Sequence, residues 1–300
     1  MAQPDNPLIA FSDKIAQLVE RAAGAVVGVD AGGRRPSSGI HWRSGVVVTA
    51  EEALERDEGI KLALPGGRVT EASLAGRDPT TDVAVLRFQP DGLSAAAVAN
   101  AAPRAGEIVL AVGSHDGAPL AHLGVVAFAN GPWQSRRGGT IDRLLRLDLS
   151  LSPAAEGGAI VDVEGRVIGM AVLGPRRRAL AIPSATIDRA VDQLLARGHV
   201  FRGYLGAGLQ PLRRHRTNGT SQASGSGVLV VSVDPQGPSA RAGILVGDIV
   251  TTWNGNAVER VREVMRLLGP ESVGSTVDLG LIRAGAATDL KVTIGERPVA

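Results

Sequence analysis

Short apolar segments fill the chain between Ala25 and Leu173, and Gly, Pro and Asp residues separate them. The expected strands are Ala25–Val29, Gly39–Trp42, Val46–Thr49, Ile60–Leu64, Val83–Phe88, Ile108–Val112, Gly124–Phe128, Leu144–Leu149, Ala159–Val163 and Val167–Leu173. Short strands at this spacing, with no long helical pattern between them, are typical of an all-β barrel or a pair of barrels. A βαβ fold would alternate strands with helices, so the pattern excludes it.

The composition narrows the function classes. Hydrophobic residues make up 44% of the chain but aromatic residues only 3%, so the cores must consist mostly of Val, Leu, Ile and Ala. The formal net charge of +2 gives no argument for a nucleic-acid partner. The chain has no cysteine, which excludes disulfides, thiolate nucleophiles and zinc–cysteine sites. No cofactor is expected.

Two helical patterns flank the strands. Ser12 is the expected N-cap of a short first helix, and Ser184 of a second helix over Ala185–Arg197 that Gly198 ends. Met1 to Asn6 is polar, and no charged leader precedes an apolar run, so no signal peptide or membrane span is expected. The simplest prediction is a cytoplasmic protein; a periplasmic protein lacking its export signal would have the same sequence.

The length of 300 residues suggests about two domains. We expect them at 1–198 and 199–300. In the second, strands are expected at Val228–Val233, Asp248–Trp253, Val277–Arg283 and Leu290–Gly295, and helices at Ser239–Ala242 and Arg260–Leu268.

Six blocks in a fixed order carry a family resemblance. They are Ser38–Thr49, Gly76–Leu86, Asp148–Gly158, Ala181–Ser184, Arg202–Gly206 and Gly237–Val250. Together they resemble the bacterial HtrA (DegP-like) proteases, and the last two resemble a PDZ domain of the circularly permuted bacterial type. The resemblance implies a mostly β chain: a chymotrypsin/trypsin-like double β-barrel followed by an α+β PDZ domain.

The catalytic triad of that family is degenerate in this chain. Asp82 falls at the position of the catalytic aspartate, but Glu52 falls at the histidine and Glu156 at the nucleophilic serine. Serine-type acyl transfer needs a hydroxyl deprotonated by a neighbouring base, and a carboxylate supplies no such hydroxyl. The resemblance to a protease therefore predicts a pseudoprotease, with no triad member expected to be active.

Two further parts of the protease site depart from the family pattern. The oxyanion loop has Ala154 where the family has glycine and Ala155 where it has asparagine, although Gly157 keeps the tight turn. The run Arg177–Leu180 replaces a glycine-containing strand with which the family pairs an extended peptide, and its larger side chains should crowd such a peptide.

Three carboxylates at one site need a proton, an arginine or a cation to offset their repulsion. If the fold is kept, Glu52, Asp82 and Glu156 should project toward one another. Oxygen ligands would suit Ca²⁺ or Mg²⁺. The alternatives are pairing with one of the many arginines and a Glu156 turned to solvent. Ser150 and Ser152 are the nearest other hydroxyls to the nucleophile position.

The PDZ-like unit keeps more of its functional pattern. Tyr204, Leu205, Gly206 and Ala207 resemble the loop that binds a peptide's terminal carboxylate, and Arg202 could attract that charge. Leu205, Ala207 and Leu209 are expected to line the pocket for an apolar last residue. On the facing helix the candidates are Val264 and Met265. Tyr204 could equally be a packing aromatic residue.

The favoured function is a non-catalytic HtrA-like protein that binds peptides or unfolded chains through its PDZ domain, as an adaptor, chaperone-like holder or regulator. The alternatives are a peptidase with residual or unorthodox activity, and an oligomeric scaffold. The resemblance also implies a homotrimer. The sequence gives neither the partner nor its pathway.

Overall fold

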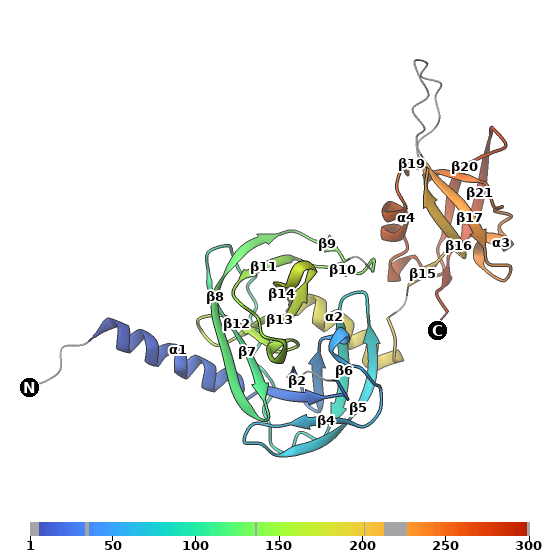
Figure 1. Cartoon of the computed structure of the whole chain (residues 1–300). Helices are drawn as coiled ribbons and strands as arrows, with labels where there is room; N and C mark the ends of the chain where they lie inside the picture. The colour runs from blue at the N-terminus through green and yellow to red at the C-terminus, as the bar shows by residue number, and fades with distance from the viewer. Residues whose placement is uncertain (1–5, 34–35, 136, 201, 213–226, 299–300) are drawn as a thin grey trace, which may run out of the picture. The chain divides into compact units, whose positions relative to one another are not determined.

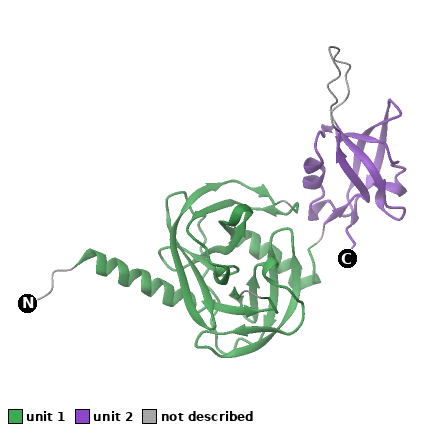
Figure 2. Cartoon of the chain, viewed as in Figure 1, with its two compact units in different colours: residues 1–200 green, residues 201–300 purple. Residues whose placement is uncertain are grey.

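The computed structural model describes residues 6–33, 36–135, 137–200, 202–212 and 227–298. The chain divides into two compact units, Met1–Val200 and Phe201–Ala300 (Figure 2). Each unit has its own apolar core, built mainly of Val, Leu, Ile and Ala as the composition predicts.

Unit 1 contains two closed six-stranded barrels (Figure 1). The first has the strand order β1 (Val26–Asp30), β2 (Ser37–Arg43), β3 (Val46–Thr49), β6 (Val83–Phe88), β5 (Val69–Asp78), β4 (Ile60–Ala63). The second has the order β11 (Leu144–Asp148), β14 (Arg178–Pro183), β13 (Val167–Gly174), β12 (Ala159–Val161), β7 (Ile108–His115), β8 (Ala118–Asn130). The double-barrel prediction is confirmed.

Short elements shape the region where the site lies. They are η1 (Glu51–Ala53), the hairpin β9 (Trp133–Gln134) and β10 (Thr140–Ile141), η2 (Pro153–Ala155) and η3 (Pro175–Arg177). The sequence analysis missed β5, whose first seven residues have no buried member, so no apolar run marks it. It also missed β14, where two arginines precede the apolar residues.

The helices differ from expectation at their N-termini. Helix α1 (Pro7–Ala23) begins before Ser12, because Asn6 is its N-cap and accepts the Leu8 N–H over 3.0 Å. Helix α2 (Ser184–Arg197) begins with Ser184 itself, and Pro183 is the N-cap residue. Gly198 ends α2 with φ +76°, a left-handed conformation that glycine adopts at no steric cost.

Unit 2 is an α+β domain. Its main sheet has the order β16 (Ala207–Pro211), β17 (Val228–Val233), β18 (Ile249–Trp253), β20 (Thr276–Arg283), β21 (Ala286–Thr293), and β19 (Asn256–Ala257) pairs with β18. A separate pair joins β15 (Gly203–Tyr204) to β22 (Gly295–Glu296). The helices are α3 (Pro238–Arg241), α4 (Val261–Leu267) and the short η4 (Pro270–Ser272).

Candidate functional site

A cavity of about 460 Å³ opens on unit 1 beside the position that resembles the catalytic triad. Its walls are mostly apolar, and charged side chains gather at it. The lining residues are Glu52, Pro79, Thr80, Thr81, Asp82, Trp133, Ser135, Arg137, Ile141, Val172, Leu173, Gly174, Pro175, Leu180 and Ile182.

Asp82 lies half-buried just before β6, in a left-handed conformation with φ +60°. The turn before it is held by Asp78, which accepts the Thr80 N–H over 3.0 Å. The Asp82 carboxylate accepts the backbone N–H of Glu52 over 2.9 Å. Burial raises the pKa of Asp82 from 3.8 to about 7; the negative charges of Glu52, Glu156 and Glu51 add to the rise, and the bond from Glu52 opposes it. Burial and the neighbouring charges therefore favour the neutral form of the Asp82 carboxyl.

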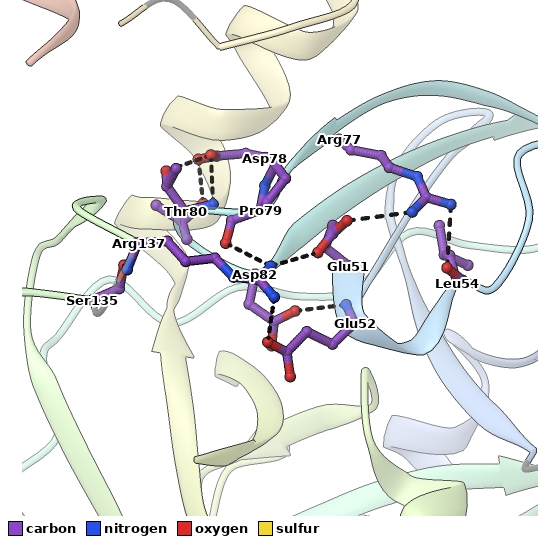
Figure 3. Close-up of polar contacts among 11 residues, drawn as sticks. Glu51, Glu52, Leu54, Arg77, Asp78, Pro79, Thr80, Asp82, Ser135 and Arg137 are labelled. Atoms are coloured by element: carbon purple, nitrogen blue, oxygen red, sulfur yellow. Dashed lines mark hydrogen bonds and ion pairs between the residues drawn. The ribbon is translucent and has the colours of Figure 1, made fainter. Parts of the chain in front are cut away.

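Glu52 extends from η1 into solvent and is paired with an arginine. Its carboxylate lies 3.1 Å from the Arg137 guanidinium, which also lies 3.2 Å from the carboxylate of Glu51 (Figure 3). Glu51 is buried and binds Arg77 as well, over 3.3 Å. Glu52, predicted to fall at the family's histidine position, is therefore one end of an ion-pair network.

Glu156 follows η2, and both its carboxylate and its backbone N–H have partners. The carboxylate accepts the Leu173 N–H over 3.1 Å, at a stretch of β13 beyond the last residue that pairs with β12. The Glu156 N–H donates to Pro153 O over 3.1 Å, closing a 3-10 turn. Ala154 lies inside this turn without a positive φ. The turn thus directs the Glu156 N–H back to the chain, not toward a bound ligand.

Gly157 and Gly158 keep the loop tightly packed. Gly157 has φ +81°, and a Cβ there would lie 2.2 Å from Ser38 O and 2.6 Å from the Thr49 hydroxyl. A Cβ on Gly158 would lie 2.4 Å from Val112 O. Both contacts are shorter than atoms tolerate, so both glycines are required by packing in this fold.

The three triad-position carboxylates share one region but do not form a ligand set. Glu52 and Glu156 are close enough to raise the pKa of Asp82, yet their carboxylates bind Arg137 and the Leu173 N–H. Within the described residues, no group of three or more His, Cys, Asp or Glu side chains could hold a metal ion. The arrangement favours the arginine alternative over the cation.

The run Arg177–Leu180, expected to crowd an extended peptide, lies mostly within strand β14. Arg178–Pro183 forms β14, which pairs with β13 along its length and with β11 at Leu180 and Ala181. Both sides of the strand are therefore occupied at these two residues, because β14 is an interior strand of the closed barrel.

Sequence reasoning missed two contacts near the site. One is the network of Arg77, Glu51 and Arg137, whose members are far apart in sequence and share no motif. The other joins His122 Nε2 and the Ser152 hydroxyl over 3.1 Å. Burial lowers the pKa of His122, which favours the neutral imidazole. Only the strand register of β8 brings this histidine beside η2.

In unit 2, the edge strand β16 and helix α4 carry the predicted peptide residues. Pairing with β17 occupies one side of β16, and the sheet order leaves the other side without a strand. Ala207 and Leu209 of β16 and Val261 of α4 are half-buried against the core, and Met265 is also half-buried. Val264, predicted to contact a peptide, is instead fully buried in the core, because the helical period turns it inward.

The loop before β16 is fixed by hydrogen bonds to its carbonyl groups. Leu205 O accepts the Ser239 N–H over 2.8 Å, and Gly206 O accepts the Asp234 N–H over 2.9 Å. The Tyr204 hydroxyl donates to Asp234 over 2.9 Å. Arg202 lies just before β15, and its carbonyl accepts the Arg297 N–H over 2.9 Å. Tyr204 therefore tethers the loop to the turn after β17.

These two units define a class of protein: a trypsin-like double barrel joined to a PDZ domain. The family model for the trypsin-like peptidase domain matches residues 37–170, and the model for the PDZ domain matches residues 203–294.

Proteins that are similar to this chain in sequence have names that fit this class. A probable periplasmic serine endoprotease, DegP-like, from Brucella suis is 31% identical over 263 residues, covering 85% of this chain and 51% of that protein. Serine endoprotease DegS from Haemophilus influenzae is 28% identical, covering 87% of this chain and 76% of that protein. The chain thus spans about half the length of the DegP-like relatives it matches.

Solved structures extend the likeness to nearly the whole chain. The serine endoprotease from Yersinia pestis has a TM-score of 0.74 and 30% identity, covering 94% of this chain and 98% of that one. The HtrA-type protease AlgW with a tripeptide has a TM-score of 0.72 and 26% identity, covering 95% of this chain. The chain belongs to the HtrA (DegP-like) family. None of the helices in the described residues is long and apolar enough to cross a membrane.

Proposed function

We propose that this chain is a non-catalytic HtrA-family protein that binds peptides or unfolded chains through its PDZ unit, as an adaptor, chaperone-like holder or regulator. The observation that carries the proposal is Glu156. Its carboxylate stands at the family's serine position and accepts the Leu173 N–H over 3.1 Å. It lacks the hydroxyl that acyl transfer requires.

The surroundings of Glu156 support the same proposal. An oxyanion hole needs N–H donors aimed at the developing charge, and the Glu156 N–H donates to Pro153 O. A general base must reach the nucleophile, and the Glu52 carboxylate is paired with Arg137. Base, nucleophile and oxyanion donor are thus each engaged in a contact within the protein.

Casein digestion tests the catalytic half of the proposal. The parent chain should release no acid-soluble fragments, and the variant Glu52→His, Ala154→Gly, Glu156→Ser restores the family residue at three of the altered positions. Digestion by the triple variant alone would show that these three positions set activity. Digestion by the parent chain would overturn the proposal.

The second candidate function is an unorthodox serine peptidase. The relatives are named serine endoproteases, and the Ser152 hydroxyl lies 3.1 Å from the half-buried His122 imidazole. Should the parent chain digest casein, a Ser152→Ala variant separates this candidate from contamination. Activity that survives Ser152→Ala would exclude Ser152 as the nucleophile.

Peptide binding tests the PDZ half. A peptide with an apolar last residue and a free carboxylate should bind more tightly than its C-terminal amide, because the loop resembles a carboxylate-binding loop. Leu209→Asp should weaken this binding roughly tenfold or more, since a charge placed on an apolar groove is costly. Leu245→Asp is the matched control, because Leu245 is 54% exposed outside β16 and α4. Equal binding of acid and amide would remove the PDZ mechanism.

Assembly and compartment belong to the same proposal. A homotrimer is supported by apolar side chains exposed on α1, Leu8 at 77%, Ile9 at 58% and Phe11 at 48%. Sedimentation velocity of the parent chain and of Phe11→Asp tests this.

The names of the DegP-like relatives favour the periplasm over the cytoplasm, and fractionation of cells making the natural gene product tests the compartment.

A further inference from the structure

Three consecutive arginines form the turn between β13 and β14. Arg176, Arg177 and Arg178 are all exposed. Among the residues that the structure describes, none of their guanidinium groups has an ion pair or hydrogen bond. Three unpaired like charges in sequence repel one another, so this turn gains no stability from its charges.

The backbone of this turn is also unfavourable for arginine. Arg176 has φ +59° and Arg177 has φ +56°. Two consecutive left-handed residues are the type I′ pattern, for which Asn-Gly is the preferred sequence. A side chain in this region costs about 1 kcal/mol or more per residue. Both the charges and the backbone conformation of this turn therefore oppose stability. Residues held in unfavourable backbone conformations often lie at functional sites, which is a reason to look for a function here.

The arginine turn continues the wall of the cavity described above. Gly174 and Pro175, the two residues that precede Arg176, line the cavity of about 460 Å³ together with Val172 and Leu173. Because Pro175 lines the cavity and Arg176 follows it directly, a ligand that extends out of the cavity past Pro175 comes near the arginine turn.

We propose that Arg176–Arg178 form a recognition surface for an acidic peptide segment whose neighbouring apolar side chain enters the cavity. The charges of the cavity lining decide where the acidic and the apolar side chains of this peptide lie. Glu52 and Asp82 line the cavity. Arg137, the one arginine among the described residues of its lining, is already paired with Glu51 and Glu52, so an acidic side chain is disfavoured inside the cavity. Trp133, Ile141 and Ile182 offer apolar surface there. The acidic residues of the ligand must therefore lie outside, over the turn.

A protein segment fits this surface better than a nucleic acid does. Single-stranded nucleic acids are bound by basic grooves that also present aromatic side chains for base stacking. The turn Pro175–Arg178 has no aromatic residue, and the net charge of the chain is only +2.

The probe for this proposal is an extended peptide with a central Leu flanked by Asp and Glu, acetylated and amidated at its ends. Amidation removes the terminal carboxylate, so the result is independent of the PDZ proposal. The parent full-length chain should bind this probe more tightly than an Asn/Gln analogue. The difference should shrink as NaCl rises from about 50 to about 300 mM, because exposed charges are screened. A central Gly in place of Leu should also weaken binding.

The decisive variant is Arg176→Asn with Arg177→Gly. It supplies the preferred type I′ residues, so its thermal midpoint should rise, while its affinity for the acidic probe falls roughly three- to tenfold through the loss of two exposed charges. Arg104→Gln with Arg146→Gln removes the same charge elsewhere on unit 1 and should leave affinity unchanged.

Three results would overturn the proposal. The turn variant could become more stable and bind the acidic probe as the parent does, which would make the arginines irrelevant to binding. The Arg104, Arg146 control could lose as much affinity, which would make the effect one of net charge. A single-stranded oligonucleotide could bind through the same arginines more tightly than the peptide, which would assign the surface to nucleic acid.

Discussion

At the scale of single residues, the three carboxylates of the candidate site differ in their partners. Glu156 accepts the Leu173 N–H, and Glu52 pairs with Arg137. Asp82 has only the Glu52 N–H and three like charges around it, so burial and repulsion raise its pKa to about 7. The aspartate that the family motif retains is thus the least stabilised charge of the three.

Asp82→Asn should make stability less dependent on pH. The folded-state pKa of about 7 lies above the unfolded value of 3.8. Between these values the folded state binds more protons, so Asp82 lowers stability as pH rises through that window. The loss is at most on the order of 4 kcal/mol, at about 1.4 kcal/mol per pKa unit. Asparagine stays neutral, tolerates the φ of +60° and still accepts the Glu52 N–H.

Urea unfolding at pH 4 and pH 8 checks this. The variant should gain stability over the parent only at pH 8. Asp116→Asn is the matched control, because Asp116 also has a positive φ, +52°, but its side chain is 92% exposed. An unchanged pH slope in Asp82→Asn would contradict the role assigned to burial.

At the scale of elements, η1 is held between β5 and the segment joining β9 to β10. The Glu51 carboxylate forms ion pairs with Arg77 of β5 and with Arg137 of the segment between β9 and β10 (Figure 3). Arg77 also donates to Leu54 O and Arg56 O, each over 3.3 Å. One buried carboxylate thus connects three segments that border the cavity.

Glu51→Ala should destabilise unit 1 by about 2–3 kcal/mol, because it removes the buried carboxylate that binds both Arg77 and Arg137. Glu52→Ala is the matched control one residue along the same turn. Its carboxylate is 54% exposed, so its loss should cost less than about 1 kcal/mol. Denaturant unfolding monitored by tryptophan fluorescence measures both. Equal losses of unfolding free energy in the two variants would show that burial of Glu51 does not determine how much this ion-pair network stabilises unit 1.

At the scale of the whole molecule, the two units have separate cores, and the one buried histidine among the described residues lies in unit 1. His41 in the first barrel is 1% exposed, and neither ring nitrogen has a hydrogen-bond partner. It packs edge-to-face on Phe88 with 5.1 Å between ring centroids. Burial lowers the pKa of His41, and the backbone of Ser94 and Arg43 opposes this only in part.

Acid should therefore destabilise unit 1 through His41. With the folded pKa below the unfolded value of 6.5, the unfolded state binds more protons as pH falls through 6.5, so stability is full above that pH and declines below it. This trend is opposite to that of Asp82. His41→Leu should flatten the decline between pH 6.5 and 4.5.

Calorimetry on the full chain separates the units. Tryptophan fluorescence also distinguishes them, because Trp42 is buried in the core of unit 1 and Trp253 in the core of unit 2. In the variant Trp253→Phe, the fluorescence change on unfolding therefore follows unit 1. His199→Leu is the control, because His199 is only half-buried. An acid decline that persists in His41→Leu would assign it to other groups.

The sequence alone determined the fold class, and it predicted which residues stand at the triad positions and that Gly157 keeps a tight turn. Strand periodicity and turn residues are local, and the family blocks place Glu52, Asp82 and Glu156 by order along the chain. Only the tertiary structure decided what those carboxylates bind, that β14 is an interior strand, and that Val264 is buried while Arg176–Arg178 remain unpaired. Ion pairs, strand edges and burial depend on segments brought together from distant parts of the chain, and no local pattern records them.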